Sequence, residues 1–346
     1  MEYRPLGDTG IEVSAICLGT MTFGKQNTEN EAFAQLDMAR ERGVNFIDTA
    51  EMYPVPPEAE TQGATDRMIG NWIASRGRRE DLILATKIAG PGLSTVRNGQ
   101  GDYSRANIET SVNESLQRLQ TDYIDVFQLH WPARNSNFFG KLGYAPDANE
   151  PDPEPAIHEV LESLHTLVKA GKIRHIGLSN ESAWGAMTFL KLADAHNLPR
   201  IVSVQNPYNL LNRSYEVGLA EVSHREQVGL LAYSPLAFGV LSGKYLGGQQ
   251  PDNARLTLFD RFTRYTKEPG VKATEAYVAL ARQHNLDPAQ MALAWVTAQP
   301  FVASNIIGAT STEQLAQNLD SEAVKLSDEV LAGIESIHAA APNPSP

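Results

Sequence analysis

The sequence has little that would suit a secreted, membrane-bound or nucleic-acid-binding protein. Cys17 is the single cysteine among 346 residues, so the chain cannot form an internal disulfide bond. The net charge is −12, whereas nucleic acids and anionic membranes both require a basic face on their protein partner. Residues 1–5 contain no apolar signal region, and no apolar run is long enough to span a membrane. We therefore expect a cytoplasmic protein whose partners include neither nucleic acid nor membrane.

Several motifs of common enzyme classes are absent as well. No Gly-x-Gly-x-x-Gly turn follows an early strand, although an open doubly wound sheet that binds a dinucleotide would require one. The Gly-Lys pairs at 171–172 and 243–244 are followed by Ile and Tyr, which excludes a P-loop. No cluster has metal-ligand spacing, and no nucleophile pattern of Ser, Cys or Lys occurs. We expect no metal site.

The chain alternates short apolar segments with segments of helical spacing. This rhythm is even over residues 1–346, with no composition break, and it predicts a single domain built on a parallel sheet covered by helices. Eight units favour a closed (β/α)8 TIM barrel over the open sheet. We expect a hairpin over 1–14, long βα loops (131–155 and 237–269) over the C-terminal mouth, and a disordered Pro-rich tail at 342–346. The expected strands are 15–18, 44–47, 82–85, 124–129, 173–178, 201–204, 229–233 and 302–307, and a helix is expected over 215–226.

Three consecutive strands deliver ionisable side chains at their C-terminal ends. Asp48 ends the second strand, Lys87 the third and His130 the fourth, and Tyr53 follows on the loop after Asp48. Such ends meet at one mouth in a barrel. Each residue alone could be a helix cap or another structural group. Three in succession beside a tyrosine favour a catalytic interpretation.

This combination suits protonation of an oxyanion that forms when another species attacks a carbonyl carbon. A tyrosine can act as a general acid if its pKa falls from about 10 toward neutrality. We expect the Lys87 ammonium to lower the pKa of Tyr53, and Asp48 to orient Lys87. His130 could donate a hydrogen bond to the carbonyl oxygen. Because no nucleophile pattern accompanies the set, we expect the attacking species to be hydride from a nicotinamide.

Seven ordered motifs give the chain a family resemblance that runs nearly end to end. The sequence resembles the aldo-keto reductases, and within them it is most similar to the Tas-type bacterial members and the potassium-channel β-subunit-like members. The motifs are Gly19–Gly24, Phe46–Tyr53, Ala85–Lys87, Gln128–Pro132, Gly177–Asn180, Gln205–Tyr208 and Tyr233–Leu236.

The resemblance implies reduction of aldehydes or ketones with NAD(P)H, with Tyr53 as proton donor, Lys87 and Asp48 as its tuning pair and His130 as the carbonyl-orienting residue. It also implies a set of cofactor contacts. Lys244 and Arg255 match the cations that bind the 2′-phosphate in the channel-subunit branch, so NADPH is favoured over NADH. Solvated loop positions are the alternative for these two charges. The full implied set is Thr20, Met21, Asp48, Ser179, Asn180, Gln205, Tyr233, Ser234, Pro235, Leu236, Lys244, Arg255, Gly308, Thr310, Gln314 and Asn318.

Aromatic and apolar residues on the mouth loops are candidates for the substrate pocket. Such residues suit an apolar or aromatic carbonyl compound as the small-molecule partner. Phe138 and Phe139 could equally pack their loop, 131–155, against the barrel. A nicotinamide-binding regulatory or redox-sensing subunit with slow or vestigial activity remains the alternative to a reductase. The candidate pocket residues are Phe23, Met52, Trp131, Phe138, Phe139 and Tyr208.

Overall fold

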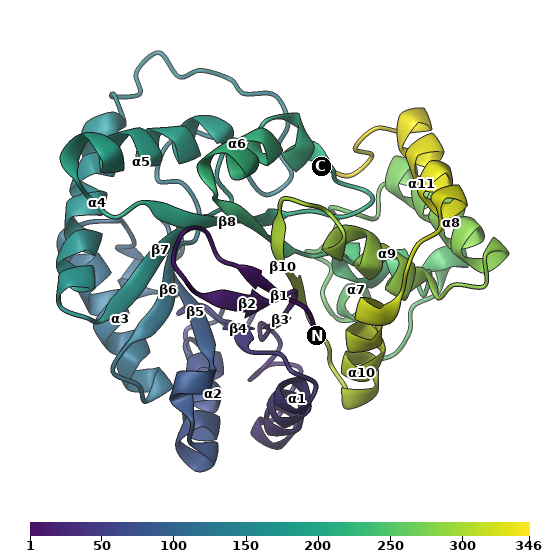
Figure 1. Cartoon of the computed structure of the whole chain (residues 1–346), viewed down its shortest axis with the longest axis horizontal. Coiled ribbons are helices and arrows are strands. Elements are labelled where there is room, and N and C mark those ends of the chain that lie inside the picture. Colours follow the sequence, from purple (N-terminus) through teal and green to yellow (C-terminus); the bar gives the residue numbers. More distant parts are fainter.

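The strands of the chain form one closed barrel and a separate hairpin. The computed structural model describes all residues from 1 to 346. The barrel strands are all parallel and follow one another in chain order, and β10 closes the ring beside β3 (Figure 1). This confirms the predicted (β/α)8 barrel and excludes the open sheet. The barrel strands are β3 (Ile16–Gly19), β4 (Phe46–Asp48), β5 (Ile83–Ile88), β6 (Ile124–Leu129), β7 (Ile173–Ser179), β8 (Ile201–Pro207), β9 (Gly229–Tyr233) and β10 (Val302–Ile307).

Helices cover the outside of the barrel with their apolar faces. In α4 (Glu154–Lys169), for example, Ile157, Leu161 and Leu164 recur at helical spacing and are buried. Removing this surface from water stabilises the packing by about 25 cal/mol per Å². None of the helices is both long and apolar enough to cross a membrane. The others are α1 (Glu29–Glu41), α2 (Ala64–Arg76), α3 (Arg105–Leu119), α5 (Ala183–His196), α6 (Leu219–Glu226), α7 (Arg255–Leu258), α8 (Glu268–Gln283), α9 (Pro288–Thr297), α10 (Thr312–Asp320) and α11 (Asp328–Ala340).

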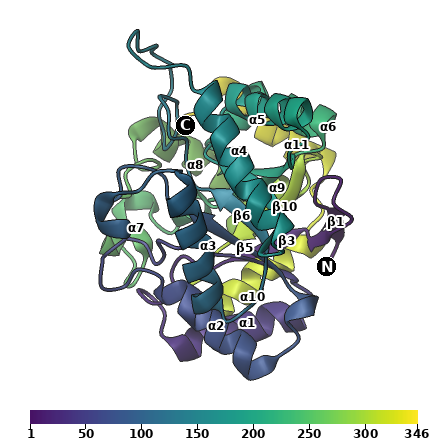
Figure 2. The same ribbon diagram turned by 90° about the vertical axis from the view of Figure 1, so that its left-hand side faces the viewer.

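The N-terminal hairpin closes one end of the barrel. It consists of β1 (Tyr3–Pro5) and β2 (Glu12–Ser14), as predicted for residues 1–14. Its Leu6 and Val13 pack against Phe46 and other apolar side chains inside the barrel. Figure 2 shows β1 at one end of the molecule and α7 at the other. The interior of the barrel is therefore closed at the hairpin end.

Three segments differ from the expectations. The tail 342–346 is packed, not disordered, because the Ser345 amide donates to Leu211 O (3.1 Å) and Ser345 is 1 % exposed. The expected helix 215–226 is broken at Gly218, whose φ of −150° ends a 3₁₀ turn before α6 begins. The connection 237–269 contains α7 and two 3₁₀ turns, since local hydrogen bonds can form where no apolar periodicity announces them.

We expect Gly70→Ala to destabilise the fold by about 1–3 kcal/mol, as overpacking does. A Cβ atom at Gly70 of α2 would lie 2.1 Å from Arg118 O and 2.9 Å from Leu119 Cα, and the α3 backbone cannot yield as a flexible side chain would. Chemical denaturation measures the change. Ala74→Ser, on the exposed face of the same helix, is the control and should stay within about 0.5 kcal/mol. Equal stability of the two variants would contradict the close approach of the helices.

Candidate active site

The register of three neighbouring strands brings the catalytic candidates together. Asp48, at the end of β4, is level with Ala85 on β5, and Lys87 lies two residues further along that strand. Lys87 is in turn level with Gln128 on β6, and His130 follows the end of β6. The closed sheet therefore places Asp48, Lys87 and His130 around one sector of the mouth, as the sequence predicts.

Lys87 lies at the centre of a buried ionic cluster beneath Tyr53. Its Nζ atom is 2.6 Å from Asp48 Oδ2 and donates to Thr49 O at 2.8 Å. A third, longer contact of 3.5 Å reaches the Tyr53 hydroxyl oxygen. The Lys87 side chain is 0 % exposed, whereas Tyr53 and His130 reach the cavity. A buried ammonium requires such partners, because desolvation of an isolated charge costs several kcal/mol.

Two glutamine side chains orient the aspartate from the opposite side. Gln205 Nε2 donates to Asp48 Oδ1 at 2.8 Å, and Gln128 Nε2 donates to the same atom at 3.2 Å. With Lys87 on Oδ2, both carboxylate oxygens are satisfied. The role of Gln128 was missed in the sequence, although a glutamine within the apolar run of β6 is a signal that could have indicated it.

Burial and charge act in opposite directions on the two central groups. Burial raises the pKa of Tyr53 above its usual value, and the Lys87 charge, which lowers that pKa, does not offset burial. Lys87 thus lowers the pKa of Tyr53 as expected, but the expected net downward shift is wrong, because it left out desolvation of the phenolate. For Lys87, burial alone would lower the pKa, but Asp48 and Tyr53 more than compensate and raise it. Lys87 thus remains an ammonium.

His130 is a neutral imidazole beside the tyrosine. Burial, and then the Lys87 charge, hold the pKa of His130 well below its usual range. The His130 and Tyr53 rings meet edge to face with centroids 5.9 Å apart. His130 Nδ1 is buried and has no hydrogen-bond partner in the protein. A neutral imidazole carries one N–H, so it can donate a hydrogen bond to a ligand oxygen without bringing a positive charge.

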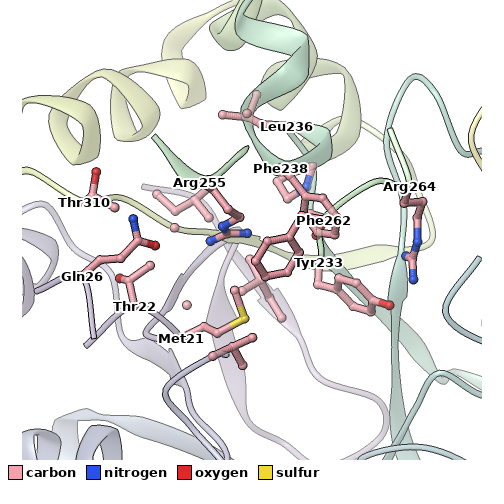
Figure 3. Close-up of a pocket in the computed structure, with 18 of the residues that line it drawn as sticks. Met21, Thr22, Gln26, Tyr233, Leu236, Phe238, Arg255, Phe262, Arg264 and Thr310 are labelled. Carbon is pink, nitrogen blue, oxygen red and sulfur yellow. The ribbon is translucent and has the colours of Figure 1, made fainter. Parts of the chain in front are cut away.

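All sixteen predicted cofactor residues line one cavity at the mouth of the barrel, which has a volume of about 1320 Å³. Figure 3 shows the part of it around Arg255, with Gln26 and Thr310 on one side and Tyr233 on the other. Tyr53, His130 and Asp48 line the same cavity. A space of this size can accommodate a dinucleotide together with a small molecule.

The cavity is basic although the protein is acidic. Besides Asp48, which Lys87 already pairs, its only side-chain carboxylate is Asp252, and no ion pair of the chain includes any of its cations. Burial, followed by the charge of Arg255, lowers the pKa of Lys244, so these two cations lie close together without a counter-charge. An anionic ligand such as phosphate would relieve their repulsion. The cavity's cations are Lys244, Arg255, Arg261, Arg264 and Lys267.

Amide and hydroxyl groups are preorganised at both ends of the cavity. Near the catalytic residues, Asn180 Nδ2 donates to His130 O at 2.8 Å, and the Tyr233 hydroxyl donates to Asn180 Oδ1 at 2.6 Å. At the other end, Gln314 Oε1 accepts from the Thr310 amide at 3.0 Å. A Cβ atom added to Gly308 would meet nothing within 4 Å, so a ligand can approach this backbone closely. These features fit the two ends of a nicotinamide dinucleotide.

Four of the six residues considered for the substrate pocket line the cavity. Met52, Trp131, Phe138 and Phe139 line the cavity, so the loop 131–155 contributes to it. Two candidates do not reach the cavity. Phe23 is 0 % exposed in the core between barrel and helices. Tyr208, which follows β8, is also 0 % exposed and stacks on Trp295 of α9 with ring centroids 5.3 Å apart.

Glu51 is a further buried residue near the site that the sequence did not reveal. Its carboxylate accepts hydrogen bonds from the Ala89 amide (2.6 Å) and Ser111 Oγ (2.7 Å), and it pairs with Arg97 (2.8 Å). These bonds tie the loop after β5 and helix α3 to the segment two residues before Tyr53. The sequence did not indicate this role of Glu51, because its partners Ala89, Arg97 and Ser111 lie far from it in the chain.

Comparisons with known proteins agree with this geometry. The aldo/keto reductase family model matches residues 15–339, which is nearly the whole chain. The chain therefore belongs to the aldo/keto reductase family, whose members are oxidoreductases that generally use nicotinamide cofactors.

Individual relatives place it more closely within the family. The chain is 54% identical to Protein tas of Escherichia coli (strain K12), over 100% of both chains. It is 33% identical to the uncharacterized oxidoreductase YrpG of Bacillus subtilis, over 97% of this chain and 96% of that one. The norsolorinic acid reductase stcV of Emericella nidulans is 32% identical, over 94% of this chain and 78% of its own. The resemblance to Tas-type members is thereby confirmed.

We expect the His130 imidazole to stay neutral well below pH 6.5, because burial and Lys87 depress its pKa. Unfolding would release a histidine of ordinary pKa, so this group's contribution to stability is present above about pH 6.5 and is lost as the pH falls below it. NMR titration of labelled histidine, with His130→Gln to assign the signal, measures the pKa. A signal that titrates near pH 6.5 would contradict the buried, neutral state.

Proposed function

We propose that this protein reduces aldehydes or ketones to alcohols with NADPH, and that Tyr53 is the general acid. The observation that supports it most is the buried Lys87–Asp48 pair beneath Tyr53, on the wall of a cavity that His130 also lines. A purely structural ion pair would not need an unsatisfied imidazole and a phenol beside it.

Tyr53 and His130 would act together on the carbonyl oxygen. When bound, the nicotinamide cofactor supplies hydride to the carbonyl carbon. The Tyr53 hydroxyl donates its proton to the oxygen as negative charge develops there, and the neutral imidazole donates a hydrogen bond to the same oxygen. Loss of the proton leaves a phenolate 3.5 Å from the Lys87 ammonium, which stabilises it. Asp48 keeps Lys87 charged and in place.

The unpaired cations of the cavity support NADPH over NADH. Lys244 and Arg255 would hold the 2′-phosphate, and the small residues from Gly308 to Thr310, before α10, would approach the adenosine part. Ser179, Asn180 and Gln205 would contact the carboxamide, and Tyr233 would stack on the nicotinamide. The apolar wall of Met52, Trp131 and the two phenylalanines favours apolar or aromatic substrates. The other residues that would contact the cofactor are Thr20, Met21, Ser234, Pro235, Leu236, Gln314 and Asn318.

We expect Tyr53→Phe to retain NADPH binding and to lose about 10²- to 10⁴-fold in the rate of aldehyde reduction, because the variant removes the proton donor and little volume. Steady-state NADPH oxidation and fluorescence titration of the cofactor measure the two effects. Tyr144→Phe, at a tyrosine that is 59% exposed, is the matched control and should behave like the wild type. Wild-type turnover in Tyr53→Phe would remove Tyr53 from the mechanism. Tight NADPH binding without turnover in the wild type would instead favour a regulatory subunit.

We expect Arg255→Ala to weaken NADPH binding by about 10- to 100-fold, the usual value of a charge-assisted hydrogen bond to phosphate, and to leave NADH almost unchanged. The dissociation constants of both cofactors for wild type and variant give the comparison. Equal weakening of both would show that Arg255 does not contact the 2′-phosphate.

A further inference from the structure

Arg264 is a cavity residue to which the proposed reaction assigns no role. It follows α7 on the long connection over the mouth and lines the cavity. Its Nη1 atom is buried and has no hydrogen-bond partner, and Arg264 forms no ion pair with a carboxylate. The Tyr233 and Tyr265 hydroxyls lie beside the guanidinium, but no carboxylate side chain neutralises it. A cavity guanidinium without a counter-charge can pair with an anionic ligand.

The position of Arg264 separates it from the phosphate-binding cations. Figure 3 shows Arg255 and Arg264 on opposite sides of Tyr233. Arg264 is the charge with the largest effect on the pKa of Tyr233, which places it beside that ring. The Tyr233 hydroxyl bonds to Asn180, and Asn180 bonds to the His130 carbonyl. Arg264 is therefore linked to His130 through Tyr233 and Asn180. Arg255 lies on the other side of Tyr233, toward Thr310, and its charge also reaches Tyr53.

A row of aromatic rings connects the catalytic histidine with Arg264. The centroids of His130 and Trp131 are 5.0 Å apart, and those of Trp131 and Phe139 are 5.8 Å apart. Phe139 is followed by Gly140, and a Cβ atom built on Gly140 would lie 3.1 Å from Arg264 Nε and 3.1 Å from the backbone oxygen of Pro346. An apolar wall thus begins at the hydrogen-bond donor for the carbonyl and ends at a cation.

We propose that the substrates are aldehydes or ketones with an aromatic or apolar body and a carboxylate at the end remote from the carbonyl. Arg264 binds that carboxylate, while the carbonyl lies at Tyr53 and His130 and the body packs along Trp131 and Phe139. The inference rests on the proposed carbonyl reduction. A planar guanidinium matches a carboxylate in geometry, and Arg264 has no ion pair that a ligand carboxylate would have to displace.

Paired probes test the anion preference. Each of two aldehydes of different length, 4-formylbenzoate and 3-(4-formylphenyl)propanoate, is compared with its neutral methyl ester in the NADPH-dependent reaction. For the length that fits, we expect the carboxylate to have a KM about 10- to 100-fold lower than its ester, as a charge-assisted pair provides, at similar kcat. Equal KM values for both pairs would overturn the proposal.

Two variants test whether Arg264 is the residue that binds the carboxylate. Arg264→Gln should abolish the carboxylate preference by raising the KM of the acid, with the ester and the NADPH dissociation constant unchanged. Arg261→Gln is the matched control, because Arg261 lines the same cavity but is exposed, and it should keep the preference. Weaker NADPH binding in Arg264→Gln would assign Arg264 to the cofactor site and overturn the proposal. An equal rise in KM for acid and ester would assign it to the fold and overturn the proposal as well.

A binding measurement separates this proposal from the reaction itself. If the esters and the acids all fail to turn over, the proposed function fails, and calorimetry then tests the subsite with 4-(hydroxymethyl)benzoate and the NADP⁺-bound protein. Binding of this acid that Arg264→Gln abolishes and Arg261→Gln retains would support the anion subsite. Absence of binding, or binding that both variants retain, would overturn it.

Discussion

The fully buried ion pair of Lys87 and Asp48 is the interaction on which the site depends. An ammonium with no exposed surface cannot exist there without a counter-charge, and the barrel supplies one from the neighbouring strand at 2.6 Å. Gln205 and Gln128 fix the other carboxylate oxygen, so the pair has one orientation. The phenol of Tyr53 lies above this positive charge. Burial, and then the same charge, keep the His130 imidazole neutral.

Around this pair the cavity combines two kinds of surface. One part carries unpaired cations, although the net charge of the protein is −12. The other part carries Met52 and the aromatic side chains of the loop 131–155. The polarity of the first suits a phosphorylated dinucleotide, and the second suits an apolar substrate body. Tyr233 lies between the two parts and separates Arg255 from Arg264 (Figure 3). One cavity can in this way distinguish two ligands by charge and shape.

Burial gives several residues that the sequence had identified a different environment from the one expected. Tyr53 stands beside Lys87 as expected, but desolvation raises its pKa above the ordinary value, so the phenol is protonated at neutral pH. Phe23 and Tyr208 belong to the core and not to the cavity, since a loop aromatic is drawn inward wherever an apolar partner such as Trp295 is available. The C-terminal tail is held by a hydrogen bond from the Ser345 amide to Leu211 O.

The sequence by itself determined the alternation of strands and helices, the closed barrel, and the strand-end positions of Asp48, Lys87 and His130, because local periodicity and strand direction suffice for these. The tertiary structure decided which side chains meet. Glu51 with Arg97, Gln128 with Asp48, and Arg264 beside Gly140 are contacts between segments remote in the chain, and no local pattern specifies them. The tertiary structure also decides the net pKa shifts, because each shift sums the effects of burial and of charges on every element packed around the group.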